Sequence, residues 1–415
     1  MRDLPTFALL LFVGMGAAMP VRAQGTSPSE AATARLGYFS AAERKLLAPH
    51  LEQGPVALVE FAEETELPAL IVATRVEAPA ADVAKVVRDV AAYPRFMPAL
   101  DEVTVQGTRG PTTSYEWVWR TAMFTLEGHN VMTEYPAPPE GSSRPHAFGV
   151  RSVKGDLGDG RFMWQVFREG PERSLLVLAS RIDMRRANWI AEQLAAGGNG
   201  VNRTINLSLA FLMVMSTKAQ VEGGEARYPS KDETEPFLNV RKLHKFLRRG
   251  DLVLLDMEGG RLNDVSVVGH MGRHESTIRA VMSDPTNFGG ALLQGSTAEV
   301  VSRDDEGVDF DWKIPLPLVG SSGRMRLEER DDGVIAVDAV SGGLEGGKWR
   351  FAIHPPSYDA ILVGWARFDP AKTSWLIERL VRNVPYFAEG LSAASQIMVI
   401  RSIRTRARDY DADAD

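Results

Sequence analysis

Residues 176–194 read LVLASRIDMRRANWIAEQL, and residues 362–380 read LVGWARFDPAKTSWLIERL. The two stretches align without a gap and share the same residue at seven positions. The matching pairs are Leu176 and Leu362, Val177 and Val363, Arg181 and Arg367, Asp183 and Asp369, Trp189 and Trp375, Glu192 and Glu378, and Leu194 and Leu380. Self-similarity of this kind within one chain indicates a repeated structural unit.

The similarity extends toward the N-terminus of each stretch. VKGDLGDGRF (153–162) corresponds to VSGGLEGGKW (340–349), and the Arg-Lys-Leu at 44–46 corresponds to the one at 241–243. The order is the same in both halves, and only loop lengths differ. We therefore predict two diverged copies of one module, at 39–222 and 237–407, joined by a polar linker at 223–236. An acidic tail is expected at 408–415.

The first 23 residues have the order of a secretory signal. Arg2 precedes an uncharged apolar stretch from Phe7 to Ala18, and small Ala23 stands at a plausible cleavage position. The apolar stretch is too short to span a bilayer, which takes roughly 20 residues. We expect cleavage near Ala23 and a periplasmic or secreted protein. The 415-residue chain has no cysteine, so its cores must hold without disulfides.

Composition narrows the classes of partner. The chain is 44% hydrophobic and 24% charged, with a formal net charge of −7 and no long run of one sign. A mildly acidic surface argues against nucleic acid as a partner and gives no electrostatic reason to bind anionic lipid. Transient membrane contact and the oligomeric state stay open.

Both halves alternate between apolar and polar residues with a period of two. Tyr115, Trp117 and Trp119 share one face of a predicted strand, opposite Glu116. This pattern predicts an antiparallel sheet that is covered on one side and wet on the other. Long amphipathic stretches close each half at 201–221 and 385–407. The predicted fold class is α+β, with two tandem modules, each a curved antiparallel sheet wrapped around a long C-terminal helix.

This element order resembles the START-like, or helix-grip (SRPBCC), superfamily. The stretch VEAPAADVAKVVRDVAAYPRFMPALDEVTV (76–105) resembles the family's opening strand and helix, followed by a Tyr-Pro-x-Phe-Met-Pro turn at 93–98. In the second half, 283–288 departs from that turn. The resemblance, which includes polyketide cyclases and coenzyme Q-binding START-domain proteins, implies a cavity between sheet and terminal helix for lipids, quinones, sterols or polycyclic compounds.

Catalytic and metal-binding patterns are scarce. We find no phosphate-binding loop, nucleophile elbow or His-x-x-x-His pair on one helix, and we expect no catalytic residue, cofactor or metal. His270 and His274 flank a strand end and predict no metal site. Asp183 and Asp369 suit helix capping better than catalysis, because proline follows Asp369 directly. Their partner arginines are expected to bind a carboxylate or sheet-edge carbonyls.

Aromatic and methionine side chains are the candidates for a ligand cavity. Tryptophans can fill a core or stack on a flat apolar ligand, and methionines supply an adaptable lining. Tyr115 and His146 are the polar groups best suited to orient a ligand. The candidate set is Tyr115, Trp117, Trp119, His146, Trp164, Leu209, Met213, Trp312, Trp349, Trp365, Phe387 and Met398.

The leading interpretation is an exported, non-catalytic binder or carrier of a hydrophobic small molecule. A two-module aromatase/cyclase-like enzyme is one alternative, which the signal sequence disfavours. An interaction scaffold with one degenerate module is the other, suggested by the divergence at 283–288.

Overall fold

A computed structural model describes residue 36 and residues 38–61, 69–120, 125–158, 160–182, 199–224, 228, 240–258, 261–290, 292, 295–315, 320–354 and 358–412. The predicted signal at 1–23, most of the linker and Asp183 lie outside these residues. In the first half the elements are α1 (Ala41–Leu51), β1 (Val56–Glu60), β2 (Leu70–Val76), α2 (Ala80–Arg88), η2 (Val90–Arg95), β3 (Leu100–Arg109), β4 (Thr112–Arg120), β5 (Thr125–Glu134), β6 (His146–Gly155), β7 (Arg161–Arg168), β8 (Ser174–Arg181) and α4 (Asn199–Val221).

The second half repeats this order of strands and helices. Its elements are α5 (Val240–Leu247), β9 (Gly250–Glu258), β10 (Arg261–His270), α6 (Glu275–Met282), α7 (Pro285–Gly289), β11 (Thr297–Arg303), β12 (Val308–Ile314), β13 (Ser321–Glu329), β14 (Ile335–Gly342), β15 (Lys348–His354), β16 (Ile361–Arg367), η3 (Pro370–Lys372), α8 (Trp375–Asn383) and α9 (Phe387–Ala412).

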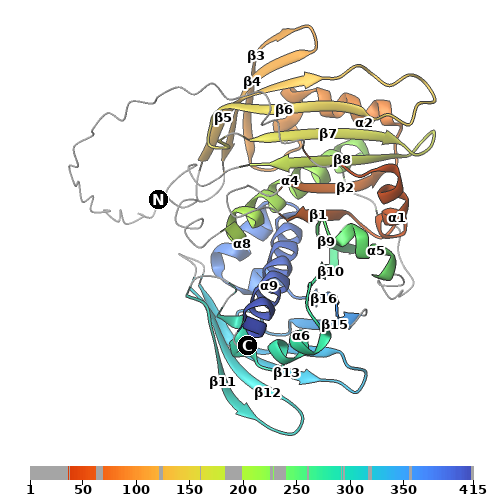
Figure 1. The fold of residues 1–415 in the computed structure, drawn as a ribbon. Helices are drawn as coiled ribbons and strands as arrows, with labels where there is room; N and C mark the ends of the chain where they lie inside the picture. The colour runs from red at the N-terminus through yellow and green to blue at the C-terminus, as the bar shows by residue number, and fades with distance from the viewer. Residues whose placement is uncertain are drawn as a thin grey trace, which may run out of the picture. The chain divides into compact units, whose positions relative to one another are not determined.

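The described strands form one continuous antiparallel sheet of 16 strands (Figure 1). The β1–β9 pair joins the two halves at the centre of the sheet. Outward from β1 the order is β1-β2-β8-β7-β6-β5-β4-β3, and outward from β9 it is β9-β10-β16-β15-β14-β13-β12-β11. The two halves thus have the same strand order on the two sides of one sheet. The chain is α+β, with a large antiparallel sheet and long helices, consistent with a helix-grip fold.

The middle of the sheet is buried on both faces, which corrects the prediction of one wet face for this part. Every residue of β2 except Arg75 is buried, and the first seven residues of β8 are buried. Alternate residues of these strands belong to two separate apolar cores. The short helices α1 and α5 cover the outer face, so the central strands have continuous apolar runs. Only strands far from the centre, such as β3 and β11, keep a largely exposed surface.

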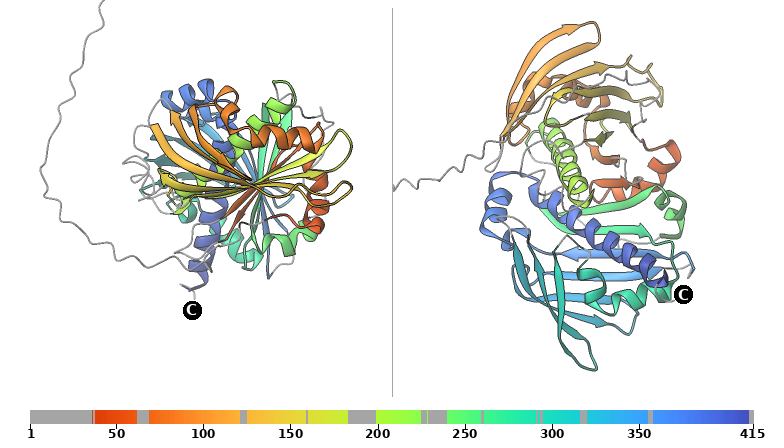
Figure 2. Two further views of the ribbon diagram at one scale, coloured as in Figure 1. Left: turned by 90° about the horizontal axis from the view of Figure 1, so that it is seen from above. Right: turned by 60° about the vertical axis from the view of Figure 1, so that its left-hand side comes forward.

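The two long helices lie on the inner face and contact each other (Figure 2). α4 packs on β2 and β8, and α9 packs on β10, β16 and β9. The helices approach closely at Gly390, where an added Cβ would lie 2.8 Å from the Cα of Ser208. α9 continues to Ala412, so the first residues of the predicted acidic tail at 408–415 are helical. Within the described part of the chain, no helix combines the length and apolarity needed to cross a membrane.

A buried ion pair fastens α9 to the centre of the sheet. Asp251 on β9 is fully buried and pairs with Arg401, at 2.8 Å between Oδ2 and Nε, and with Arg404. Although burial favours the neutral acid, the two guanidinium groups hold the pKa of Asp251 below its ordinary value. Arg401 also donates to the carbonyl of Val59 on β1. Because β1 and β9 join the halves, this contact ties the terminal helix to the junction.

Side-chain caps stabilise the starts of two helices, and the one predicted from the sequence, at Asp369, is confirmed. Ser40 and Glu43 form a capping box at the start of α1. Asp369 accepts a hydrogen bond from the backbone N–H of Ala371 at 3.0 Å, ahead of Pro370 at the first helical position. The neighbouring Arg367 contacts the carboxylate of Asp264 and a sheet carbonyl, as expected for a structural arginine.

Candidate functional site

A row of three polar side chains crosses the inner face of the first half. Tyr115 on β4 pairs directly with Asn130 on β5, and Asn130 pairs with Ser152 on β6. These residues are only 5%, 6% and 5% exposed, and the surrounding side chains of the inner core are mainly apolar. We call Tyr115, Asn130 and Ser152 the polar row. It is a hydrogen-bonding strip inside an apolar interior.

Several polar atoms in and beside the polar row have no hydrogen-bond partner among the described residues. They are Oδ1 of Asn130, Oγ of Ser152 and Nε1 of Trp117, which lies two residues after Tyr115 on the same face of β4. A buried polar atom without a hydrogen bond costs about 1–3 kcal/mol, so proteins rarely leave several together. Together they offer a donor, an acceptor and a hydroxyl to a bound molecule.

Tyr115 acts as a neutral hydrogen-bonding group here. Burial raises the pKa of Tyr115 to about 12, although its hydrogen bond with Asn130, at 3.4 Å between Oη and Nδ2, lowers it slightly. At neutral pH the phenol therefore keeps its proton. The strip can position a polar group of a ligand, but it holds no side chain that would readily take up a proton at neutral pH.

His146 lies away from the polar row. It is on the same face of β6 as Ser152 but six residues earlier, about 20 Å along the strand at 3.3–3.4 Å per residue. Burial, followed by the charge of Arg88, lowers the pKa of His146. Tyr115 and His146 are thus separate features rather than an acid–base pair.

Trp117 forms a wall beside the polar row. It pairs with Gly128 on β5, where an added Cβ would lie 2.7 Å from Cζ2 of the indole. The glycine allows the ring to lie close against the neighbouring strand. Trp117 is 5% exposed, which leaves its unpartnered N–H directed into the protein interior.

The second half has apolar residues at the positions that correspond to the polar row. Trp312 pairs with Gly323 as Trp117 pairs with Gly128, and its Nε1 also lacks a partner among the described residues. The row two residues away consists of Phe310, Met325 and Ala339. The sheet geometry is therefore shared, whereas the polar row belongs to the first half alone.

The remaining candidate residues fall into three groups. Trp164, Trp312 and Trp349 are buried in the inner core, and Trp119, Leu209 and Met213 are half-buried against it. Phe387 and Met398 are half-buried on α9, beside the core positions Ala393, Ile397 and Ile400.

The inclusion of Trp365 among the cavity residues assumed that it faces the inner, helix-covered side of the sheet, and this orientation is wrong. Its neighbours Gly364 and Ala366 face the inner core, and Trp365 points to the outer face, where it hydrogen-bonds the carboxyl of Asp264. The side chain of Arg367 lies over its ring, 5.5 Å from the centroid. Strand alternation alone could not reveal this, because the central strands are apolar on both faces.

The Tyr-Pro-x-Phe-Met-Pro turn has a structural role. Tyr93 is buried in η2, and its hydroxyl donates to the carbonyl of Val87 at 2.5 Å. Its ring packs edge-on against Phe96. The turn thus closes the end of α2 and directs the chain into β3, without a free polar group for chemistry.

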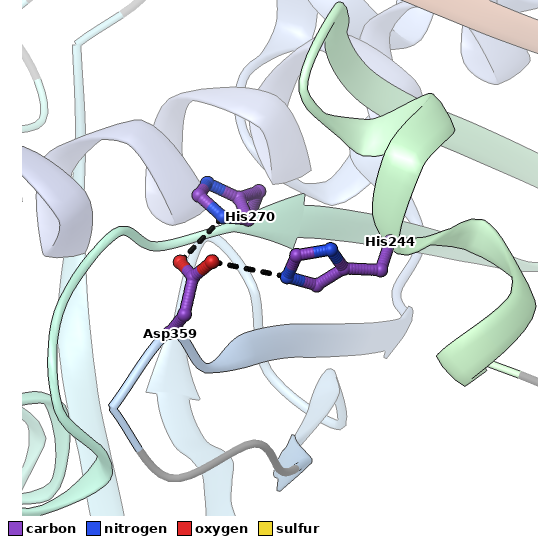
Figure 3. A group of neighbouring side chains, drawn as sticks. All are labelled: His244, His270 and Asp359. Atoms are coloured by element: carbon purple, nitrogen blue, oxygen red, sulfur yellow. Dashed lines mark hydrogen bonds and ion pairs between the residues drawn. The ribbon is translucent and has the colours of Figure 1, made fainter.

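A group of side chains that the sequence did not bring together lies in the second half (Figure 3). His244 from α5 and His270 from the end of β10 both contact Asp359, which precedes β16. Nε2 of His270 lies 2.5 Å from Oδ1 of Asp359, and Nε2 of His244 lies 3.1 Å from Oδ2. We call these three residues the His-His-Asp cluster. Their wide separation in sequence hid them, and His274 instead caps α6.

Solved structures with low sequence identity are similar to parts of this chain. No protein-family model and no curated protein matches the chain. The Zhui aromatase/cyclase from a Streptomyces species is 18% identical, with a TM-score of 0.32, covering 38% of this chain and 98% of that one. The di-domain ARO/CYC StfQ is 12% identical, with a TM-score of 0.28, covering 82% of this chain and 99% of its own. A STAR-related lipid transfer protein from Xanthomonas axonopodis is 17% identical, with a TM-score of 0.31, covering 41% and 94%.

These three neighbours are named as aromatase/cyclase and lipid-transfer proteins. At such low TM-scores, the fold assignment rests on the strand order and helices of the chain itself.

Proposed function

We propose that the first half binds a hydrophobic small molecule between its sheet and α4, and that it carries the molecule without changing it. The polar row and Trp117 support this proposal, because their unpartnered buried atoms form one strip in an apolar interior. A ligand hydroxyl or carbonyl on this strip would supply the missing hydrogen bonds.

The chemistry of the strip favours a neutral ligand. Tyr115, Asn130, Ser152 and Trp117 carry no charge at neutral pH, and burial of an unpaired carboxylate is strongly unfavourable. We therefore expect a sterol, quinone or polycyclic compound with one hydroxyl or carbonyl group to bind better than an ionised fatty acid.

Two further parts of the proposal concern the origin and location of the chain. We propose that 39–222 and 237–407 are diverged helix-grip modules, supported by the matching strand order and the shared Trp-Gly pairs. We also propose export, supported by the signal-like order of residues 1–23. Ligand binding would then belong to the first module, with the second as its diverged partner.

The test is extraction of the purified chain with organic solvent, followed by mass spectrometry of the extract. The delipidated chain is then titrated with cholesterol, a short-chain ubiquinone and palmitate. We expect a co-purifying neutral molecule or binding of a neutral probe, weakened at least tenfold in the variant Tyr115→Phe/Asn130→Leu/Ser152→Ala.

The matched control is Phe351→Leu, a buried aromatic on β15 of the second half, which should leave binding unchanged. An empty extract together with no uptake of any probe would contradict the proposal. Equal probe binding by the wild type and the triple variant would show that the polar row does not contribute to ligand binding.

A further inference from the structure

The His-His-Asp cluster brings three ligand types together from distant parts of the chain. Its ligand atoms all lie within 4.8 Å of one another, and the two imidazole rings meet nearly edge to face at 5.3 Å (Figure 3). Both Nε2 atoms point toward the same carboxylate, on Asp359. From this convergence we propose that His244, His270 and Asp359 form a binding site for one divalent transition-metal ion of the zinc type.

The donor set fits this class of ion. Two imidazole nitrogens and one carboxylate oxygen are common zinc ligands, with bonds of about 2.0–2.2 Å in tetrahedral geometry. Donor atoms around such an ion stand about 3.4 Å apart, which follows from those bond lengths. The two Nε2–Oδ distances at Asp359 are 2.5 and 3.1 Å, and no two ligand atoms lie more than 4.8 Å apart, so side-chain rotation is needed to reach this spacing. Magnesium and calcium prefer oxygen ligands and fit poorly.

The cluster lies at the edge of the protein interior. The side chains of His244, His270 and Asp359 are 22%, 19% and 21% exposed, although Nε2 of His270 itself is buried, so a solvent molecule could supply the fourth ligand from the exposed side of the cluster. Arg248 approaches to 3.9 Å from Oδ2 of Asp359, but its side chain is 65% exposed and can turn into solvent. The nearby Arg404 guanidinium is held by Asp251.

The first half provides an internal comparison. Arg75 occupies the position that corresponds to His270, because Arg75 pairs with Leu175 and His270 pairs with Ile361. Arg173 corresponds to Asp359, because each lies two residues before the paired residue on the neighbouring strand. These arginines pair with glutamates and line a charged surface cleft. Arginine does not ligate metals, because its guanidinium stays protonated and has no acceptor. One ion per chain is therefore expected, in the second half.

A bound ion would fasten α5 to the sheet. The cluster joins α5 with the end of β10 and the segment before β16, and α5 covers the outer core of the second half. Ligands that bind only the folded state stabilise it. The expected role is thus a structural clamp, independent of the apolar ligand proposed for the first half.

The experiment uses the full chain, freed of metal with EDTA and desalted. Zinc chloride is titrated by calorimetry at pH 7.5, and cobalt chloride is titrated with absorption spectroscopy to report the coordination geometry. We expect one site per chain, a tetrahedral cobalt spectrum and a higher midpoint of thermal unfolding with zinc. His244→Ala, His270→Ala and Asp359→Asn should each weaken zinc binding at least tenfold.

The control variant is His274→Asn, which removes a neighbouring histidine and keeps a good residue for capping α6. It should bind zinc like the wild type. Circular dichroism of each metal-free variant checks folding, and Asp359→Asn preserves the side-chain shape if a histidine variant is unstable. The proposal is overturned if zinc does not bind, or if folded Asp359→Asn and a folded histidine variant bind it as tightly as the wild type.

Discussion

Replacing the polar row with apolar side chains of similar shape should stabilise the ligand-free protein. The variant is Tyr115→Phe/Asn130→Leu/Ser152→Ala. Each substitution removes polar atoms and nearly preserves the side-chain outline, and the matching positions of the second half already carry apolar residues. Most multiple substitutions in a core destabilise a protein, so an increase in stability would be a distinctive result.

The expected size follows from the unpartnered atoms. Oδ1 of Asn130 and Oγ of Ser152 each lack a partner among the described residues, and each such atom costs about 1–3 kcal/mol. The Tyr115–Asn130 hydrogen bond is long, at 3.4 Å, so its loss costs about 0.5–1.5 kcal/mol. Removing the two unpartnered atoms gains about 2–6 kcal/mol, and losing the hydrogen bond costs about 0.5–1.5 kcal/mol, so the free energy of unfolding should rise by about 0.5–5.5 kcal/mol.

Equilibrium unfolding in urea of the delipidated chain measures this change. A higher midpoint with an unchanged m-value is expected, because the surface exposed on unfolding stays similar. Ser180→Ala is the matched control: its buried hydroxyl donates to Oδ1 of Asn206 at 2.8 Å, so this change should destabilise by about 1–3 kcal/mol. If the triple variant is less stable than the wild type by 1 kcal/mol or more, the polar row has hydrogen-bonding partners in the folded protein, which would contradict this prediction.

Three other substitutions test the surrounding structure. Asp251→Asn should lower the free energy of unfolding by about 3–5 kcal/mol, because it removes the negative charge that pairs with buried Arg404 and half-buried Arg401. Since the folded-state pKa of Asp251 is lowered, its contribution is present above about pH 4 and should be lost in urea titrations at lower pH. Gly128→Ala should lower the free energy of unfolding by about 1–3 kcal/mol, because the added methyl group would clash with the indole of Trp117. Near-ultraviolet circular dichroism would report the displaced indole, and an unchanged spectrum with unchanged stability would contradict this prediction. Tyr93→Phe should lower the free energy of unfolding by about 1–3 kcal/mol, because the buried carbonyl of Val87 would lose its hydrogen-bond donor. An unchanged free energy of unfolding in urea would show that the turn does not depend on this hydrogen bond.

Much of the fold could be predicted because its signals are local. The alternation of Tyr115, Trp117 and Trp119 identified β4, and Asp369 followed by proline identified the cap of η3. The joining of both halves into one sheet could not be predicted, because β1 and β9 pair across almost 200 residues. Continuous apolar runs such as β8 also do not reveal which side chain faces which core, and this explains the wrong orientation of Trp365.

The candidate site was predictable only in part. Tyr115 and Trp117 stood out as large residues on a predicted inner face, whereas Asn130 and Ser152 gave no sequence signal. Their importance comes from strand register, which places both beside Tyr115. The His-His-Asp cluster was hidden for a related reason, because its members lie on three elements that only the tertiary structure brings together.

Photo-crosslinking tests the location of the ligand most directly. A neutral probe bearing a diazirine, such as a photoreactive sterol or quinone, is bound to the full chain, irradiated, and mapped by peptide mass spectrometry. Crosslinks are expected in β4, β5, β6 or α4, at 112–120, 125–134, 146–155 or 199–221, and an excess of the unlabelled probe should remove them. Competable crosslinks confined to residues 240–412 would contradict a binding site in the first half.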